Sequence, residues 1–575
     1  MKLPSAHSSD SITFLNISRK HVESRDEIDI AKAATLADQP EDFHGDVGLA
    51  GPGDTVYLIP TPSPDPRDPL NLPVLRKLFL LTFVAIYATV GLTMVSGLGG
   101  VLGTFIPIYV AEGRTEADIT WLMTFPTLFM GIGNLIGMPI ALAVGRRPVF
   151  LTSTLILVLS GGLCAGQQSY TWHLAARCIM GLAAGQSEAL CPLMVQETFF
   201  LHERGRTQMY FTAISNILTS VLTLLTSYIA ASVGVSGWYG LGTGLAGFVF
   251  ICSIFFVPET KYDRPIAAYQ GKGSSVSQFA GQRGGGRSES DDASPVATSY
   301  LVRRISTTDP RELDTVNYKP RTLASDMRLF VNKPDWEEGL RTWRRMFTVM
   351  LFPDILWAFL LNGLTIGVNI SLGTTYGSIL AAPPYSWASK YISFAMAGQI
   401  VVSFVALPLL GAGSDHLVRY LSKRNGGIHR PEHRLVPLVF PVIVGILSAI
   451  LYGQAAAHPD RLHWFAIVFA VNAYYFAFVG ANQCGIVYSL DSYPTRSGPA
   501  LVVICAMRGI LSFGTSYGVT PFIKQRGYDG AYLIYGILTG VLGAMGIVIY
   551  FLSGRIRAFC SRWAVSTSET KPTYS

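Results

Sequence analysis

The chain has 575 residues, of which 50% are hydrophobic and only 14% are charged, whereas about 25% of the residues of an average soluble protein are charged. This composition excludes an ordinary soluble enzyme. The net charge of +7 is not gathered in basic blocks interleaved with aromatic residues, so binding of nucleic acid is not expected. The seven cysteines show neither a zinc-site spacing nor a disulfide framework, and no metal or cofactor is expected.

Long apolar runs dominate the chain, and twelve can be distinguished. Each run is about 18 to 26 residues long, which is enough to cross a bilayer core as a helix. Helices are required because backbone amides in lipid must be satisfied within their own segment. The predicted spans are 78–100, 119–142, 148–169, 173–196, 208–231, 238–257, 350–374, 391–410, 435–452, 464–489, 499–523 and 531–552.

The hydrophilic segments divide these spans into two groups of six. The sequence therefore predicts an all-α membrane protein with two six-helix bundles. The regions rich in Ser, Asp, Glu, Pro and Gly are predicted to be disordered. The predicted parts are a cytoplasmic N-terminal region (1–76), an N-terminal bundle (77–257), a cytoplasmic central loop (258–349), a C-terminal bundle (350–552) and a cytoplasmic tail (553–575).

Lysine and arginine in the short loops indicate the orientation, because cytoplasmic loops carry an excess of these residues. One side has Arg146, Arg147, Arg204, Arg206, Arg419, Lys423, Arg424, Arg430, Arg434, Arg496, Arg555, Arg557 and Arg562. The other side has Arg114, Lys390, Arg461, Lys524 and Arg526. Both termini and the central loop are therefore predicted to be cytoplasmic.

An amphipathic helix is predicted just before the seventh span. Trp336, Leu340, Trp343 and Phe347 recur at helical spacing, with charged residues between them. Such a helix is typical of one that lies on the inner membrane surface. The alternative is a helix that packs on the loop itself.

The segment DPLNL at Asp68–Leu72 lies just before the first predicted span. It is similar to the DPxNW signature that precedes the first helix of fungal major facilitator superfamily transporters of the twelve-span drug/proton antiporter type, with Leu72 in the tryptophan position. The resemblance implies the major facilitator fold with a central cavity between the bundles. It also implies a monomer in the lipid bilayer, expected in the cell membrane, that acts on a small-molecule substrate and protons.

Two loops match the gating motif of that family. Gly145, Arg146 and Arg147 match its end, although Leu142 occupies the position of the aspartate. The resemblance implies a latch of arginines on acidic groups and helix C-termini, which in this half is weakened or differently built. The second copy keeps its acid and consists of Gly411, Asp415 and Arg419. The alternative is that these arginines are ordinary positive-inside anchors.

The predicted fourth span contains two charges, Arg177 and Glu188. Charges inside a membrane helix are expensive, so both are expected to face the protein interior or a water-filled cavity. Arg177 matches an arginine to which the family assigns a role in proton coupling. The hypothesis is that Glu188 takes up the proton and that Arg177 acts on it across a shared aqueous chamber. The rival is that Glu188 forms a structural ion pair with another span.

Further polar side chains lie inside the apolar runs. Asn134, Asn362 and Asn482 are candidates for substrate contact, and each is equally a candidate for an interhelical hydrogen bond. Arg508 lies near the middle of its span and needs a counter-charge, which is either an anionic substrate or Glu188.

The fifth span departs from the family pattern. It lacks the glycine and proline run of the antiporters and reads ISNILTSVLTLLTSYIAA. The predicted function is export of a drug or secondary metabolite in exchange for protons. The alternatives are coupled uptake of an organic cation such as a polyamine and a membrane sensor without transport. An enzyme is not expected, because the chain has no HExxH motif.

Overall fold

The computed structural model describes residues 58, 60–167, 169–262, 313–314, 318–331, 334–424, 430–493 and 497–564, and within these ranges the regular elements are all helices. The described residues belong to the unit Gly45–Ser575, which is distinct from the unit Met1–His44. The segment 271–299, one of those predicted to be disordered, lies outside the described residues, and so does most of the N-terminal region 1–76. Of that region, residues 58 and 60–76 are described, and they include a 3₁₀ turn and the start of the first long helix.

The N-terminal bundle agrees with the predicted spans and adds one short helix, α3, that the sequence analysis did not predict. A 3₁₀ turn, η1 (Pro69–Asn71), precedes the bundle, and another, η2 (Gly97–Gly100), follows its first helix. The helices are α2 (Val74–Ser96), α3 (Leu102–Ala111), α4 (Glu116–Val144), α5 (Arg146–Ala165), α6 (Tyr170–Thr198) and α7 (Leu201–Phe256).

The C-terminal bundle follows two connecting helices, α9 (Leu323–Asp326) and α10 (Trp336–Met350). Its long helices are α11 (Pro353–Ala381), α14 (Val439–Ala457), α15 (Trp464–Ser492), α16 (Ser497–Tyr517) and α17 (Val519–Ala564). Between α11 and α14 lie η5 (Ser389–Met396), α12 (Gly398–Ala406), η6 (Leu407–Ala412), α13 (Gly413–Arg424) and η7 (Pro431–Leu438).

The predicted span 391–410 lies within a helical segment, Lys390–Leu421, that is long and apolar enough to cross a membrane, but it is not a single α-helix. This stretch is a 3₁₀ helix, then α12, then the π-helix η6. Pro408 lies in the first turn of η6. Because proline has no N–H and its ring clashes with the carbonyl four residues earlier, a regular helix cannot continue unchanged at this position.

Eleven segments of the described residues are long and apolar enough to cross a membrane. One of them, Arg206–Phe256, has 51 residues, whereas about 20 helical residues suffice for one crossing. Its backbone leaves helical geometry at Gly234, where φ is 79°. This break falls between the predicted fifth and sixth spans. A similar break in α17 occurs at Gly527, just after the predicted end of span eleven. The number of twelve crossings stays a prediction.

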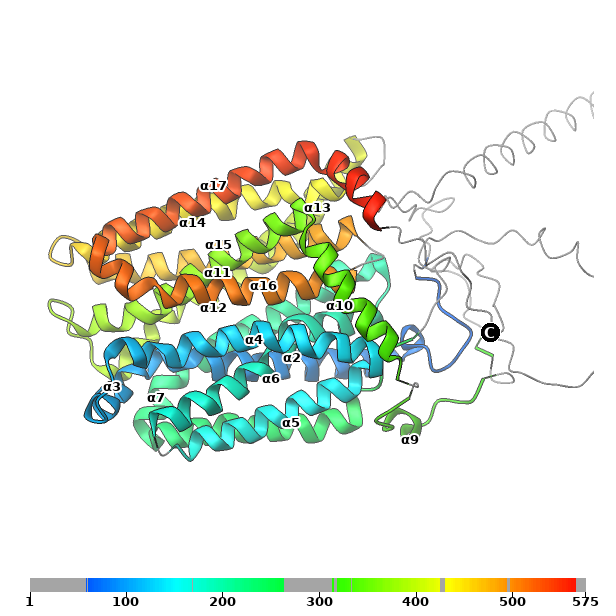
Figure 1. The fold of residues 1–575 in the computed structure, drawn as a ribbon, viewed down its shortest axis with the longest axis horizontal. Coiled ribbons are helices and arrows are strands. Elements are labelled where there is room, and N and C mark those ends of the chain that lie inside the picture. The colour runs from blue at the N-terminus through cyan, green and yellow to red at the C-terminus, as the bar shows by residue number, and fades with distance from the viewer. Residues whose placement is uncertain are drawn as a thin grey trace, which may run out of the picture. The chain divides into compact units, whose positions relative to one another are not determined.

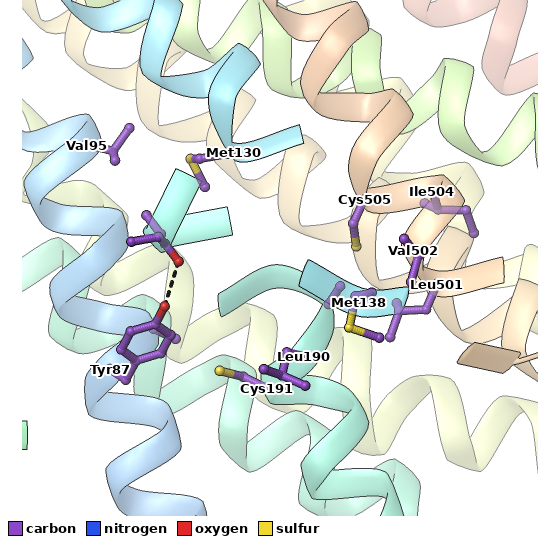
Figure 2. Packing of buried hydrophobic residues seen from close by; sticks show 14 of the residues in the cluster. Tyr87, Val95, Met130, Met138, Leu190, Cys191, Leu501, Val502, Ile504 and Cys505 are labelled. Atoms are coloured by element: carbon purple, nitrogen blue, oxygen red, sulfur yellow. Dashed lines mark hydrogen bonds between the residues drawn. The ribbon is translucent and has the colours of Figure 1, made fainter. Parts of the chain in front are cut away.

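The two bundles meet along a seam between α4 and α16 (Figure 1). Glycines allow this approach, because a Cβ added at Gly131 would lie 2.7 Å from the Ala506 carbonyl oxygen. Figure 2 shows the buried apolar cluster around the seam, to which Met138 of α4 and Leu501 of α16 both belong.

Arg177 lies in the packed interior of the N-terminal bundle and joins three other helices to α6. Its Nε donates to the Leu122 carbonyl at 2.7 Å. Its Nη1 donates to the Met94 carbonyl at 3.1 Å and to the Tyr239 hydroxyl at 2.8 Å, and its Nη2 donates to the Val95 carbonyl at 2.6 Å. The side chain is completely buried.

The acceptors explain why an arginine is needed here. Leu122 lies four residues before Pro126, so its carbonyl has no N–H partner within α4. Met94 and Val95 lie in the last turn of α2, where carbonyls also lack intrahelical partners. Arg177 therefore satisfies backbone groups that the helices leave open.

We expect Arg177→Met to destabilise the N-terminal bundle, because it leaves these carbonyls buried without donors. The expected loss is at least about 2 kcal/mol of unfolding free energy, seen as a lower thermal unfolding midpoint of the detergent-solubilised protein. Arg555→Met is the matched control, because Arg555 is exposed on α17. Equal midpoints for the two variants would contradict the structural role of Arg177.

Candidate functional site

A cavity of about 1080 Å³ lies between the two bundles. The N-terminal bundle contributes residues of α2, α4, α6 and α7 to its wall, and the C-terminal bundle contributes residues of α11, α15 and α16. The volume is at the upper end of the range for pockets that enclose drug-sized molecules. A site of this size, shared by both bundles, suits a small organic ligand.

The cavity extends to the end of the molecule where the arginine-rich loops lie, which we call the basic end. Arg206, Arg419 and Lys423 line it there, and their side chains are exposed. The aspartates Asp415 and Asp491 also line this end, and both pair with Arg434. Exposed cations at the rim favour entry of anionic or neutral molecules over cations.

At the opposite end the two bundles are in contact. The Ser227 hydroxyl of α7 donates to the Lys390 carbonyl at 3.2 Å. The rings of Trp121 in α4 and Tyr517 in α16 stack at 5.7 Å between centroids. The structure is thus closed at this end and accessible from the basic end.

An ion pair in the cavity wall joins the two bundles. Arg508 Nη2 of α16 lies 2.6 Å from Glu188 Oε1 of α6, and the side chains are only 6% and 8% exposed. Arg508 Nη1 also donates to Asn482 Oδ1 of α15, whereas Nε has no hydrogen-bond partner in the structure. All three residues line the cavity. Of the two partners that the sequence allowed for Arg508, the structure selects Glu188.

Arg177 does not line this cavity with Glu188, which corrects the expectation of a shared aqueous chamber. The two residues are eleven positions apart, about 16 Å along the helix axis. At the level of Arg177, helix α6 is enclosed by α2, α4 and α7. The guanidinium of Arg177 therefore donates mainly to backbone carbonyls of these neighbouring helices. Arg177 and Glu188 thus do not face each other across the cavity.

The three candidate asparagines differ in position. Asn482 lines the cavity, but Asn134 and Asn362 are not among its lining residues. Both are buried, with amide atoms that have no hydrogen-bond partner in the structure. Asn362 packs against α15, since a Cβ added at Gly485 would lie 2.9 Å from its Nδ2. Among the described residues, neither amide forms a hydrogen bond with Glu188 or Arg508.

A polar stripe of α7 also lines the cavity, and the sequence analysis missed it. Its members recur every three or four residues, which places them on one face of a helix. The stripe consists of Thr212, Asn216, Thr219 and Thr223. The signal was present in the fifth span as polar residues at helical spacing, but these residues carry no charge and match no motif of the family.

Aromatic and amide side chains complete the wall. Tyr475 and Phe478 of α15 and Tyr376 of α11 line the cavity, and so do Asn369 and Gln483. Apolar faces with a few polar groups are typical of sites for small organic molecules.

The first gating motif begins with Gly145, whose φ is 136°. Glu259 accepts hydrogen bonds from the backbone N–H of Arg146 at 2.9 Å and of Arg147 at 3.2 Å. It therefore caps the N-terminus of α5, where a negative charge is favourable. A Cβ added at Gly145 would lie 2.5 Å from Glu259 Oε2. Glycine is therefore favoured here both by the positive φ and by the lack of room for a side chain.

The latch at this motif is built without the aspartate that Leu142 replaces. Arg146 pairs with Glu197 of α6 at 2.6 Å. Arg147 donates to the carbonyls of Ile254 at 2.7 Å and Val257 at 2.6 Å, at the C-terminal end of α7. The expected pairing of arginines with acids and helix C-termini is present, with the acid supplied by another helix.

The second motif has a different arrangement. Gly411 lies in the π-helix η6, and Asp415 pairs with Arg434 of η7 at 2.6 Å. Arg434 also contacts Asp491 of α15 at 3.1 Å. Arg419 lies at the cavity rim. The pairs of both motifs thus lie within single bundles, whereas the Glu188–Arg508 pair joins the two.

Comparison with known proteins identifies the family of this fold. The profile of the Major Facilitator Superfamily matches residues 78–501. The chain belongs to the major facilitator superfamily. It is a multi-pass membrane transporter with the all-α, two-bundle fold of that superfamily.

The similar proteins include fungal transporters. An uncharacterised MFS-type transporter of Schizosaccharomyces pombe, C1271.10c, is 22% identical over 88% of this chain and 89% of its own length. Protein HOL1 of Saccharomyces cerevisiae is 21% identical over 88% of this chain and 91% of its own length. The efflux pump vrtL of Penicillium aethiopicum is 27% identical over 27% of this chain and 29% of its own length.

Solved structures of the superfamily share the fold. The xylose transporter XylE from E. coli, in a partially occluded inward-open conformation, has a TM-score of 0.51 and 12% identity. That comparison covers 81% of this chain and 95% of XylE.

We expect the Glu188–Arg508 pair of this major facilitator protein to show strong coupling in a double-mutant cycle. Glu188→Gln and Arg508→Gln each leave a charge buried without its partner, whereas the double variant leaves none. The coupling energy is expected to be about 1–3 kcal/mol, measured from unfolding of the detergent-solubilised variants. Additive effects of the two substitutions would show that the contact contributes nothing to stability.

Proposed function

We propose that this facilitator exports a small organic compound by alternating access, in exchange for protons. The observation that supports this most directly is the Glu188–Arg508 pair, a buried carboxylate–guanidinium contact between the two bundles inside a shared cavity. A carboxylate in a membrane-spanning helix is a functional-site candidate by default. Here it also bridges the two parts that must move against each other.

The proposed topology has twelve crossings, with both termini and the central loop in the cytoplasm of a cell-membrane protein that acts as a monomer. The basic end is then cytoplasmic, in accordance with the positive-inside rule. The cavity is accessible from that end, so the structure corresponds to the state in which an exporter takes up its substrate.

The proposed coupling uses the loss of one charge. A proton on Glu188 removes the negative charge that Arg508 contacts, which weakens the link between the bundles and favours their rearrangement. In the proposed cycle the pair, which is formed in the state open to the basic end, forms after the proton leaves toward that end. Proton entry from the opposite side and substrate exit toward it complete an exchange.

The gating loops have a separate role in this proposal. The contacts of Gly145, Arg146 and Arg147 stiffen the N-terminal bundle, and the pairing of Asp415 with Arg434 stiffens the C-terminal bundle. Gly411 instead lies against Met209 of α7, in the other bundle. Each bundle then moves as a rigid unit. Arg419 lies at the rim of the cavity at the basic end, which must close when the cavity opens to the opposite end. Similarity to a protein named as an efflux pump, vrtL, agrees with export. The aromatic and amide side chains of the cavity wall do not specify the class of substrate.

Transport by Glu188→Gln tests this proposal. The protein is expressed in a yeast lacking its own efflux pumps, and accumulation of labelled organic cations, anions and neutral compounds is measured with and without a protonophore. The native protein is expected to lower accumulation of at least one compound in a protonophore-sensitive way. The substitution should reduce this effect by tenfold or more, because glutamine cannot exchange a proton.

A control variant and the direction of the change in accumulation distinguish export from uptake and from a sensor without transport. Ser187→Ala is the control, because Ser187 lines the cavity beside Glu188 but carries no charge, and this variant should retain protonophore sensitivity. Raised accumulation of a cation such as a labelled polyamine would instead indicate uptake. No change with any compound would favour a sensor without transport. Export by Glu188→Gln with unchanged dependence on the proton gradient would refute the proposed coupling.

A further inference from the structure

Helix α10 (Trp336–Met350) has two stripes of residues that differ in burial: one is buried and the other is exposed. Gly339, Thr342, Met346 and Val349 are buried, and their spacing of three or four residues places them on one stripe. A second stripe of large apolar side chains is exposed. With 15 residues the helix is about 22 Å long, too short to cross a bilayer core of about 30 Å.

The buried stripe rests on both bundles. The backbone N–H of Asp335, just before α10, donates to the Ala143 carbonyl at the end of α4, at 3.1 Å. A Cβ added at Gly339 would lie 3.1 Å from the Ala143 Cβ, so the helix approaches α4 closely. α10 also packs against α16, and Figure 1 shows it crossing the ends of both helices. It therefore covers the seam between the bundles at the basic end.

The exposed stripe is large and apolar. Trp336 is 64% exposed, Leu340 74% and Phe347 60%. Trp343 and Leu351 extend the same stripe. Tryptophan and phenylalanine beside leucine are the side chains that interfacial helices place at the boundary between headgroups and acyl chains.

Arginines accompany this stripe. Arg341 and Arg344 are exposed and Arg345 is partly exposed, and Arg341 pairs with Glu337 at 2.7 Å. The helix has one further acid, Glu338, and both glutamates lie in its first turn, so the rest of the helix carries only positive charge. A helix with an apolar stripe and a basic flank binds anionic lipid through both.

We propose that α10 binds anionic lipid in the leaflet at the basic end and thereby stabilises the arrangement in which the cavity is open to that end. Lipid holds the exposed stripe and its arginines, while the buried stripe holds α4 and α16 together. Because α10 contacts both bundles, a rearrangement of the bundles must change the contacts of α10 with α4 and α16. Lipid composition then biases the conformational equilibrium, whatever the substrate and the direction of transport.

Tryptophan quenching tests the position of the helix. The full-length protein is placed in nanodiscs that contain phosphatidylcholine brominated near the headgroup. Trp336→Phe/Trp343→Phe is expected to remove a fraction of the quenchable fluorescence, and Trp238→Phe, which removes a buried tryptophan, is the control. If the double variant and the control change quenching equally, another part of the chain or a second copy covers the stripe, and the proposal is overturned.

Labelling of the cavity tests the coupling. Reaction of Thr212→Cys with a soluble maleimide, relative to the parent protein, is followed as phosphatidylserine is titrated into phosphatidylcholine nanodiscs. We expect faster labelling with phosphatidylserine. Arg344→Gln should raise the phosphatidylserine fraction at the midpoint by about fivefold, since each basic residue near such a surface contributes that factor. Arg555→Gln, which removes an exposed arginine of α17, is the matched control and should not move the midpoint.

Gly339→Leu separates lipid binding from its effect on the cavity. The added side chain pushes α10 from α4 but leaves the outer stripe intact. It is expected to retain quenching by brominated lipid and to lose the response of Thr212→Cys labelling to phosphatidylserine. Thr212→Cys labelling that does not respond to phosphatidylserine when Gly339 is retained, or a response that survives Gly339→Leu, would overturn the proposed coupling.

Discussion

The contact on which the site depends is the buried ion pair between Glu188 of α6 and Arg508 of α16. Removing two charges from water is costly, and their attraction offsets this cost only with good geometry and further hydrogen bonds. Asn482 supplies one such bond, while Arg508 Nε has no hydrogen-bond partner among the described residues. The pair is therefore poorly explained by stability alone. Its place between two bundles that enclose a cavity agrees with a contact that must break and form again.

Polar side chains have a second task, which is to complete backbone hydrogen bonding where helices end or contain proline. Arg177 serves the carbonyl that Pro126 leaves open and the last turn of α2. Arg147 serves the end of α7, and Glu259 caps the start of α5. In lipid no water can satisfy such groups, so each unsatisfied one is expensive. These contacts tie the helices of the N-terminal bundle to one another, which the proposed movement of whole bundles requires.

The two ends of the cavity differ in the forces that act on them. At the closed end, contacts such as Ser227 with the Lys390 carbonyl and Trp121 with Tyr517 join the bundles directly. At the basic end, exposed cations surround the cavity rim, and α10 spans the seam from outside. In the proposed arrangement, a helix in that position contacts both the lipid and the two bundles that move, and the membrane can act on the transporter through it.

The sequence by itself determined the helical class, the positions of most spans and the short helix α10, because an apolar run of bilayer length or an amphipathic period is a local property. It also singled out Glu188 and Arg508, since a charge in an apolar run is conspicuous. The tertiary structure alone decided that these two pair and that Arg177 lies elsewhere. Partner choice depends on which helices become neighbours and on where prolines leave carbonyls open, and no local pattern contains that information.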